Sequence, residues 1–297
     1  MEATRLPQPR TGLTYDCEPT LNDQQVFEFC RKGYLMLEAV VEDELNQRMM
    51  DFIAAHPDEH QPLELLFEDW FVDGIFKNPQ AAGAVRSLLG AHFKLPQTFC
   101  NHRAACPAPA QGWHRDGGSI YTPRLDYLQV FYYPQDTPLE MGPTEVIPGS
   151  HFMRTKAPYL GHIRSVKGTV ATTAPAGTIF LTVYSIWHRK GKSSGSGFRN
   201  LIKYNYWRTA PPRRDWIVDP EADFSWPTFS NAPYFEQFKC GIAAAEMFSW
   251  LANEPYEHSG GQCWPCEAPE KPPCDQEGLP PVLRRYSDPL SSSSIGF

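Results

Sequence analysis

Several features are missing from this sequence, and each absence argues against a class of protein. No apolar run is long enough to cross a bilayer as a helix. Residues 1–7 lack the apolar core of a signal peptide, so we expect a cytoplasmic protein with no membrane partner. Basic residues are not in surplus, because the formal net charge is -7 at pH 7. Such a balance leaves little positive charge for phosphates and predicts no nucleic-acid partner.

The sequence also lacks the compact cysteine framework of small secreted domains. Its eight cysteines are scattered over 297 residues, and in a reducing compartment we expect them to be free thiols. The 29 prolines and 13% aromatic residues disfavour long helices and favour turns and strands. No internal repeat is visible. A hydrophobic content of 41% is enough for one large core.

Helical periodicity is concentrated in the first part of the chain, and one more helix is expected over 235–253. Asn22 or Asp23 caps an apolar segment that ends at Gly33, and further helices are expected over 42–55 and 79–89. After Gly90 the pattern becomes one of strands separated by turn residues. The expected strands are 34–38, 92–94, 98–103, 113–116, 127–133, 142–147, 169–173, 178–188 and 199–207.

Helices followed by strands in one chain predict a mainly β fold, in which an N-terminal helical layer flanks a β-barrel core. Residues 1–20 are expected to form an irregular arm, and residues 21–254 a single domain. Residues 255–297 are rich in proline, cysteine and serine, and we expect a disordered tail there.

Candidate metal ligands occur in the segment 112–118. If this segment is extended, His114 and Asp116 point to the same side and can bind one metal ion. Gly117 and Gly118 follow and leave space for a ligand. With His188 as a third ligand, two histidines and one carboxylate form the facial triad of non-haem iron oxygenases. The alternative for His188 is a half-buried histidine that bonds only to backbone.

A single arginine is the candidate anchor for an anion. The glycine- and serine-rich loop 191–197 is expected to be a hairpin turn that makes strands 178–188 and 199–207 antiparallel neighbours. Arg199 would then lie close to His188, and its guanidinium matches a carboxylate bidentately. The alternative partner is an internal Asp or Glu side chain.

The strand that follows has one unusually polar face. Residues two apart share a face, so Arg199, Leu201, Lys203 and Asn205 should line the same side of the sheet. A water-lined pocket explains this polarity better than a dry core does.

The segment 140–151 contains Gly142-Pro143 and, shortly after, Pro148-Gly149-Ser150-His151. It lies between the His-X-Asp triplet and a distal histidine that is followed by an arginine. This combination resembles the phytanoyl-CoA dioxygenase family of Fe(II)/2-oxoglutarate oxygenases. The resemblance covers about residues 20–208, because residues 21–37 also look like the opening of that family.

The resemblance implies a double-stranded β-helix, or jelly roll, with Fe(II) and 2-oxoglutarate as cofactors. Arg199 would pair with the distal carboxylate of 2-oxoglutarate, and Thr144 and Asn101 would make further contacts. His151 would be structural, and Lys190 departs from the small hydroxyl residue common at that position in the family. The implied iron ligands are His114, Asp116 and His188.

The implied function is a dioxygenase that uses O₂ to hydroxylate an aliphatic C–H bond of a small organic molecule, with release of succinate and CO₂. Relatives that halogenate lack the carboxylate ligand, so Asp116 favours hydroxylation or another oxidation such as desaturation. The alternatives are another metal-dependent cupin-type enzyme and a catalytically silent barrel that acts as a binding module. The oligomeric state and the substrate are not predicted. The aromatic residues Trp113, Tyr121, Phe131 and Trp187 would suit either a ring-bearing substrate or the core.

Overall fold

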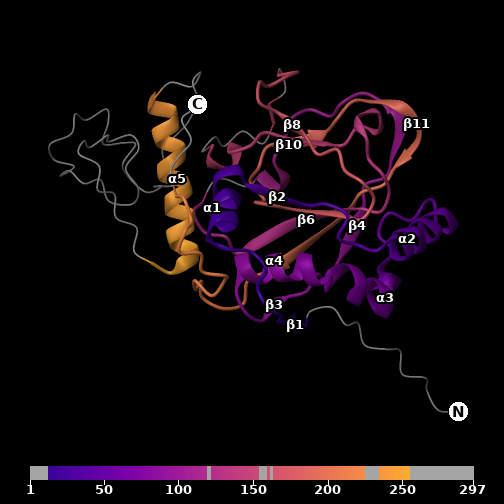
Figure 1. The fold of residues 1–297 in the computed structure, drawn as a ribbon. Coiled ribbons are helices and arrows are strands. Elements are labelled where there is room, and N and C mark those ends of the chain that lie inside the picture. Colours follow the sequence, from indigo (N-terminus) through magenta and orange to yellow (C-terminus); the bar gives the residue numbers. More distant parts are fainter. Residues whose placement is uncertain (1–12, 119–121, 154–158, 161–162, 225–233, 255–297) are drawn as a thin grey trace, which may run out of the picture.

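The computed structural model describes residues 13–118, 122–153, 159–160, 163–224 and 234–254 (Figure 1). The α-helices are α1 (Asp23–Lys32), α2 (Asp43–Ala55), α3 (Asp69–Phe71), α4 (Pro79–Leu89) and α5 (Tyr234–Ala252). Shorter 3-10 or π turns are η1 (Leu63–Phe67), η2 (Val72–Phe76), η3 (Asp116–Gly118), η4 (Leu139–Met141) and η5 (Ser150–Phe152). The strands are β1 (Thr14–Tyr15), β2 (Tyr34–Leu37), β3 (Phe93–Lys94), β4 (Phe99–Asn101), β5 (Ala104–Ala108), β6 (Tyr127–Tyr133), β7 (Thr144–Val146), β8 (Val170–Ala171), β9 (Thr178–Thr182), β10 (His188–Lys190), β11 (Ser193–Arg199) and β12 (Ile202–Trp207).

The helix ends follow the capping residues of the sequence. Asn22 caps α1 and forms a capping box with Gln25, and Gly33 ends the helix with a φ of 79°, in the left-handed region. Asn78 caps α4, and Pro79 occupies its first turn. The predicted helices at 42–55 and 79–89 are confirmed within one residue.

The strands form three antiparallel sheets. The large sheet has the order β1-β3-β12-β6-β9-β2, with β4 also paired with β12. A three-stranded sheet has the order β10-β7-β8, and β11 pairs with β5. The prediction of a mainly β fold is therefore confirmed, as a mainly antiparallel arrangement of strands with a few helices.

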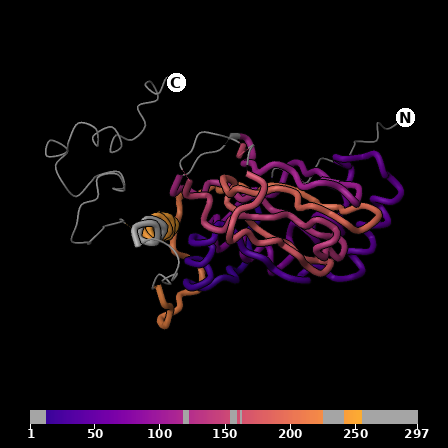
Figure 2. The backbone as a smooth tube through the Cα atoms, turned by 90° about the horizontal axis from the view of Figure 1, so that it is seen from above, coloured from indigo at the N-terminus to yellow at the C-terminus, as the bar shows by residue number. Residues whose placement is uncertain are grey.

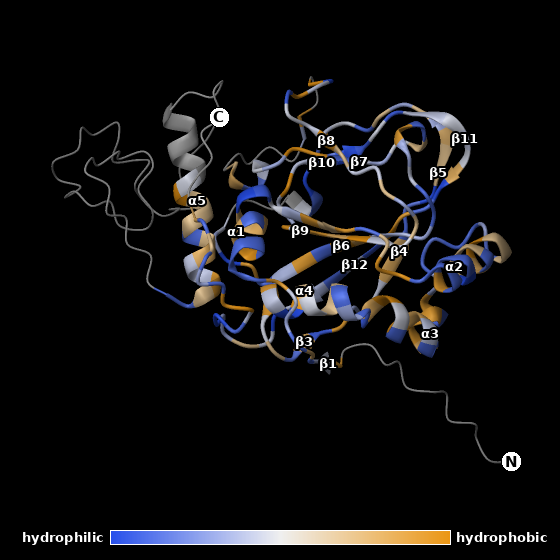
Figure 3. Ribbon diagram, viewed as in Figure 1, coloured by the Kyte–Doolittle hydropathy of each residue, from blue (hydrophilic) through white to orange (hydrophobic). Residues whose placement is uncertain are grey.

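The large sheet has two faces with different neighbours. On one face, side chains such as Val130, Tyr132 and Ile202 share a hydrophobic core with buried residues of α1, α2 and α4. On the other face, Phe131 and Phe180 belong to a second, smaller cluster. Figure 3 shows hydrophobic and hydrophilic colours on different sides of α2, as a helix with one buried face requires.

The smaller cluster joins the large sheet to the three-stranded sheet. It contains Val146 from β7 as well as Phe131, Phe180 and Leu201 from the large sheet or its ends. Because these side chains are packed together, the two sheets face one another across this cluster. The inner face of the large sheet is therefore the face that a site between the sheets would use.

Helix α5 packs beside α1 at one edge of the molecule, as the view from above shows (Figure 2).

A buried carboxylate lies at the start of α1. Asp23 is fully buried and accepts hydrogen bonds from Arg214 at 2.6 Å, from Trp216 Nε1 at 2.7 Å and from the Asp219 amide at 2.7 Å. Burial raises the pKa of this carboxyl, but these donors outweigh burial and leave the pKa below its ordinary value.

Replacing Asp23 with asparagine is expected to lower the free energy of unfolding by about 3 kcal/mol, because a buried ion pair loses one charge. The loss should be full at neutral pH. It should shrink as the pH falls through the lowered pKa of Asp23, because the wild-type carboxylate is then protonated. Urea unfolding at several pH values measures this, with the exposed Asp43→Asn in α2 as control. An equal loss at all pH values would contradict the role of the charge.

Three predicted features of the strands are wrong. Segment 178–188 is not one strand, because β9 ends at Thr182 and β10 begins at His188 in another sheet. Strand β12 is not the neighbour of β9, because β6 lies between them. The loop 191–197 is not a hairpin turn, because most of it forms β11 against β5. The sequence of β11 is polar and contains several glycines, so it lacks the residues that usually indicate a strand.

The segments that flank the predicted domain lie largely outside the described residues. Of the expected arm, Thr14–Tyr15 forms β1, which pairs with β3. The expected tail, residues 255–297, lies wholly outside them, and the domain limits stay predictions. In the described ranges the cysteines Cys17, Cys30, Cys100 and Cys106 are free thiols. None of the helices that the structure describes has the length and hydropathy that a membrane crossing needs.

Candidate active site

The backbone brings the two candidate histidine ligands together. The His114 amide donates to the His188 carbonyl at 3.0 Å, and the His188 amide donates to the His114 carbonyl at 3.0 Å. Their ring centroids lie 4.5 Å apart. The predicted strand 113–116 is wrong, because His114 makes isolated bridges and η3 begins at Asp116. The pairing nevertheless places both imidazoles side by side.

Each imidazole is oriented by a carbonyl of its own segment. His114 Nδ1 lies 2.9 Å from the Gly112 oxygen, and His188 Nδ1 lies 3.0 Å from the Ile186 oxygen. A carbonyl only accepts hydrogen bonds, so Nδ1 carries the proton in both rings. In the neutral form of each ring, Nε2 then keeps a free lone pair, which is the tautomer that a metal-binding histidine needs.

The turn η3 places the carboxylate beside these two nitrogens. Asp116 Oδ2 lies 3.5 Å from His188 Nε2, and Oδ1 lies 4.0 Å from His114 Nε2. Gly117 has a φ of 59°, and a Cβ there would lie 3.2 Å from the Tyr184 hydroxyl. A left-handed residue without a side chain therefore allows the turn. The three ligand atoms all lie within 4.8 Å of one another.

The protonation states also suit a metal. Burial lowers the pKa of His188 to about 4, against the opposing effect of Asp116. Burial raises the pKa of Asp116, but His188, Lys203 and Gln129 outweigh it and lower the pKa overall. At pH 7 the imidazole is therefore neutral and the carboxylate ionised, which are the forms that bind divalent metals. The donor set fits the two-histidine, one-carboxylate pattern of iron.

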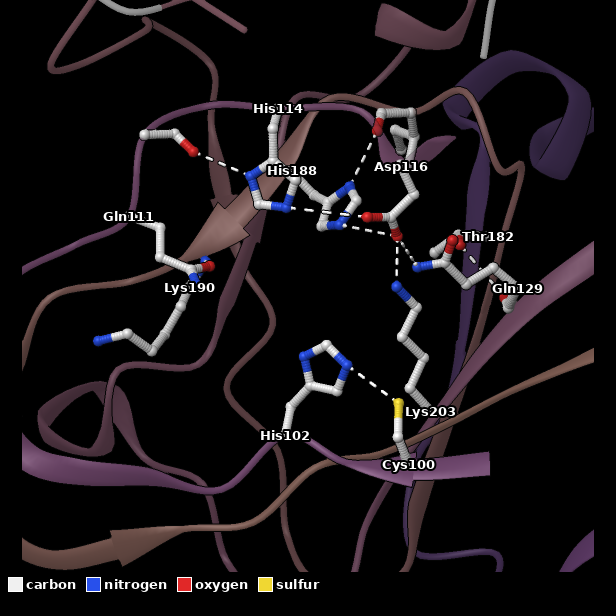
Figure 4. Close-up of polar contacts among 12 residues, drawn as sticks. Cys100, His102, Gln111, His114, Asp116, Gln129, Thr182, His188, Lys190 and Lys203 are labelled. Atoms are coloured by element: carbon white, nitrogen blue, oxygen red, sulfur yellow. Dashed lines mark hydrogen bonds and ion pairs between the residues drawn. The ribbon is translucent and has the colours of Figure 1, made fainter. Parts of the chain in front are cut away.

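Two side chains of the large sheet support the carboxylate. Lys203 in β12 forms a short ion pair with Asp116 Oδ2, and Gln129 Nε2 in β6 donates to the same oxygen at 2.9 Å. Figure 4 shows the imidazoles and Lys203 all directed at this carboxylate. Both contacts hold Asp116 in place and ionised.

Neither Lys203 nor Gln129 was assigned to the site from the sequence. The alternation along 199–205 does place Lys203 on the polar face, and the register confirms this, because Lys203 lies opposite Phe131 of the inner face. Gln129 carried no signal of its own. Its place became visible only from the pairing of β6 with β12.

Arg199, the last residue of β11, is a buried cation with few polar partners for its charge. It is 3% exposed, and its Nη1 donates to the Gly142 carbonyl at 3.2 Å. Nε has no hydrogen-bond acceptor, and Arg199 forms no ion pair among the residues that the structure describes. By contrast, Arg189 pairs with Glu145 at 2.6 Å. The alternative of an internal salt bridge for Arg199 is therefore not seen in the described part of the chain.

Burial lowers the pKa of the Arg199 guanidinium, against the opposing effects of Tyr133 and Cys106. A buried cation without an anion costs free energy unless a ligand supplies the negative charge. Lys190 is close enough to Arg199 to feel its charge. Burial is the main cause that lowers the pKa of Lys190, and the positive charge of Arg199 is the second. Its Nζ donates to the Pro109 carbonyl at 2.9 Å.

Thr144 and Asn101, the two further predicted contacts, lie in different surroundings. Thr144 is buried in β7 directly opposite Lys190, two residues along from Val146, which faces His188. Asn101 lies opposite Ile202, whose side chain belongs to the helix-facing core. The side-chain Nδ2 of Asn101 donates to Asn200 Oδ1 at 3.1 Å, and its Oδ1 accepts from the Leu201 backbone amide at 3.2 Å. The structure therefore does not bring Asn101 to the triad.

The face of β4 that does look toward the triad carries Cys100, which lies opposite Lys203. His102 Nε2 contacts the Cys100 sulfur at 3.1 Å, and Figure 4 shows its ring facing the same space as the two ligand histidines. Burial, Lys203 and Arg199 lower the pKa of His102 to about 4, so its ring is neutral at pH 7. No sequence motif marked His102.

His151 lies away from the triad, in η5. It is fully buried, its Nε2 lies 2.9 Å from the Cys30 carbonyl, and burial lowers its pKa to about 4. Its ring packs so closely on Gly33 that a Cβ there would lie 2.4 Å away. These contacts fit the structural role expected for His151. Trp113 and Trp187 are likewise fully buried, so they pack in the core, and Tyr121 lies outside the described residues.

Known proteins with the same fold hold metals. The structure is similar to HygX from Streptomyces hygroscopicus with iron bound, with a TM-score of 0.53 and 14% identity over 64% of this chain and 88% of that one. HygX with nickel and 2-oxoglutarate bound matches at a TM-score of 0.52 and 15% identity over 64% and 88%. The epimerase SnoN, in complex with Fe3+, alpha ketoglutarate and nogalamycin RO, matches at 0.51 and 15% identity over 63% and 83%. At such identities the likeness shows the fold alone.

No curated protein sequence matches the chain. The family model described as phytanoyl-CoA dioxygenase (PhyH) does match, over residues 17–201. This range is more than half of the chain and contains all three candidate metal ligands and Arg199. The chain therefore belongs to the phytanoyl-CoA dioxygenase family, and the two cofactors predicted from its sequence, Fe(II) and 2-oxoglutarate, are confirmed with that membership.

Proposed function

We propose that this protein is a non-haem Fe(II)/2-oxoglutarate-dependent dioxygenase that hydroxylates an aliphatic C–H bond of a small organic molecule. The fold would be a double-stranded β-helix whose two walls are the large sheet and the three-stranded sheet. Arg199 carries the proposal, because this buried guanidinium lacks an anion in the described structure. Another metal-dependent cupin-type enzyme, or a silent binding module, would need no such charge between the sheets.

Iron(II) would be held by His114 Nε2, His188 Nε2 and one oxygen of Asp116, leaving positions open for the keto acid and O₂. When bound, the metal would activate O₂, which is the oxidant, while 2-oxoglutarate would supply two electrons and be converted to succinate and CO₂. The backbone bridge between His114 and His188 fixes two ligands relative to each other. Lys203 and Gln129 fix the third by holding Asp116 Oδ2.

Arg199 would bind the distal carboxylate of 2-oxoglutarate, with the cation of Lys190 close by. Thr144 lies opposite Lys190, and its buried side chain would contact the same cosubstrate. Asn101 is not part of the proposal, because its amide is engaged by Asn200 and Leu201. The protein's share of the reaction would be to orient the C–H bond and to keep water from the oxidant.

The solved relatives support the cofactors and leave the outcome of the reaction open. HygX has been seen with nickel and 2-oxoglutarate, and SnoN with Fe3+ and alpha ketoglutarate. Because SnoN is named an epimerase, epimerisation is the second candidate for the reaction here. Both outcomes begin with removal of hydrogen from a substrate carbon, so the same arrangement of residues would serve either.

The proposal is tested by anaerobic titration with Fe(II) and 2-oxoglutarate. Wild-type protein is expected to develop the weak visible charge-transfer band of the iron–keto acid chelate. His188→Ala should lose the band, whereas His92→Ala, which removes an exposed histidine outside the site, should keep it. Absence of the band in wild type, or its survival in His188→Ala, would overturn the assignment.

A further inference from the structure

The inner face of the large sheet continues past the carboxylate ligand in regular cross-strand pairs. Antiparallel register makes directly opposite residues of two strands share a face. Along β6 and β12, successive pairs on the inner face are Phe131–Lys203, Gln129–Asn205 and Tyr127–Trp207. Asp116 is hydrogen-bonded within the first two pairs, so the third pair lies just beyond the proposed iron site.

The two ends of this row differ in packing. Toward Leu201 the row ends in the small hydrophobic cluster with Phe131, Phe180 and Val146. The other end is aromatic and partly open, because Trp207 is 43% exposed and Tyr127 is half-buried. This second end is therefore the one from which a molecule can reach the face beside Asp116.

The open end presents flat aromatic surfaces. The rings of Tyr127 and Trp207 are stacked with centroids 4.7 Å apart, and Tyr184 meets Tyr127 edge-on at 5.0 Å. Tyr184 also borders η3, because its hydroxyl is the nearest neighbour of a Cβ placed at Gly117. These three rings therefore form an apolar wall that reaches from solvent to the turn that carries the carboxylate ligand.

Two buried carbonyl oxygens lie between this wall and Asp116. Gln129 is 1% exposed, and its amide nitrogen is used by Asp116, which fixes the side-chain oxygen as Oε1. Neither Gln129 Oε1 nor Asn205 Oδ1, on the opposite strand, receives a hydrogen bond within the described part of the chain. Two neighbouring buried acceptors without a donor are costly and rare in folded proteins.

We propose that Gln129, Asn205 and the wall of Tyr127, Tyr184 and Trp207 form the substrate subsite. Its ligand is a ring-bearing small molecule with a hydroxyl or amino group that donates to the two carbonyl oxygens while the ring packs on the aromatic wall. This inference rests on the proposed function, since it places the substrate beside Asp116. A group without a hydrogen-bond donor is disfavoured there, because Gln129 Oε1 and Asn205 Oδ1 can only accept hydrogen bonds.

Three probes that share a phenethyl group and differ in the polar group at its end test the subsite: phenethyl alcohol, phenethylamine, which is a cation at neutral pH, and methyl phenethyl ether. Their binding to full-length protein loaded with Zn(II) and 2-oxoglutarate is measured by saturation-transfer NMR. The alcohol and the amine are expected to bind about tenfold more tightly than the ether, because only they satisfy the carbonyl oxygens. An alcohol that binds no better than the ether, or no saturable binding of any probe, overturns the proposal.

Variants distinguish the hydrogen bond to the two carbonyl oxygens from packing of the probes on the aromatic rings. Asn205→Leu should remove the preference for alcohol over ether, and Asn205→Asp should restore it and favour the amine most. Trp207→Ala should weaken all three probes, whereas Phe198→Ala, which removes an equally exposed ring on β11, should not. Retention of the full preference in Asn205→Leu contradicts the assignment.

Charge-transfer titration of the same variants with Fe(II) and 2-oxoglutarate checks the iron site separately. An intact band with no donor preference would refute the subsite alone. A missing band in wild type would refute the proposed function.

Discussion

Arg199→Met is expected to weaken binding of 2-oxoglutarate about a hundredfold, which corresponds to roughly 2.7 kcal/mol lost from a buried, hydrogen-bonded charge pair. Affinity for the metal alone should stay unchanged, because Arg199 contacts none of the three candidate ligands in the structure. Titration of 2-oxoglutarate into anaerobic Fe(II)-loaded protein measures the first quantity, and calorimetry with Co(II) measures the second.

The stability of the ligand-free protein provides the control. Arg199→Met removes a buried cation that has no carboxylate partner in the described structure, so the midpoint of thermal unfolding should not fall. Arg189→Met, by contrast, leaves Glu145 without its partner at 2.6 Å and should lower that midpoint. If Arg199→Met unfolds at a lower temperature and keeps full affinity for 2-oxoglutarate, the arginine is structural and not an anchor.

Asp116→Ala is expected to reduce affinity for divalent metal by more than about a hundredfold. Changing a residue that merely orients a ligand already costs 10- to 100-fold, and here the ligand itself is lost. Oxidation of any substrate should fall at least as far. Calorimetry with Co(II) and succinate release measure the two effects, and Asp126→Ala, an exposed aspartate in the loop before β6, is the control.

The same change also removes the anion that Lys203 holds. Metal-free Asp116→Ala should therefore lose about 2 kcal/mol of unfolding free energy, because the half-buried ammonium keeps no carboxylate partner. The double variant Asp116→Ala/Lys203→Met should recover this stability without recovering metal affinity. Metal binding that returns in the double variant would show that Asp116 acts only by neutralising Lys203.

The parts of the fold that depend on near neighbours could be predicted from the sequence. Periodicity, together with capping residues such as Asn22, placed α1, α2 and α4. The run 127–133 matches β6 at both ends. These patterns are local, since a helix face or an alternating strand is written within about ten consecutive residues.

Features that depend on non-local pairing were missed or misread. The polar, glycine-containing β11 has neither apolar alternation nor β-branched residues, so nothing local distinguished it from a turn. The insertion of β6 between β9 and β12 is a matter of topology. For the same reason Gln129 and Lys203 gave no sign that they share one oxygen of Asp116, because cross-strand register is set by the assembled sheet.

Within the candidate site too, residues close in sequence could be placed together, whereas contacts between distant residues depend on how the strands pair. His114 and Asp116 are neighbours in sequence, and they face one another although their segment is a turn and not the expected strand. His188 reaches them through the pairing of its own backbone with that of His114. Asn101 shows the opposite outcome, since its strand lies beside the site while its side chain faces the helix-covered core.

The reciprocal hydrogen bonds between His114 and His188 hold two segments of the chain together at the site. They join two segments that are far apart in sequence, and a metal bound between the imidazoles would add a second tie across the same loop. A metal that binds only the folded chain stabilises the folded state by mass action. Loss of iron would therefore lower the stability of the fold around the two histidines as well as abolish the chemistry of the site.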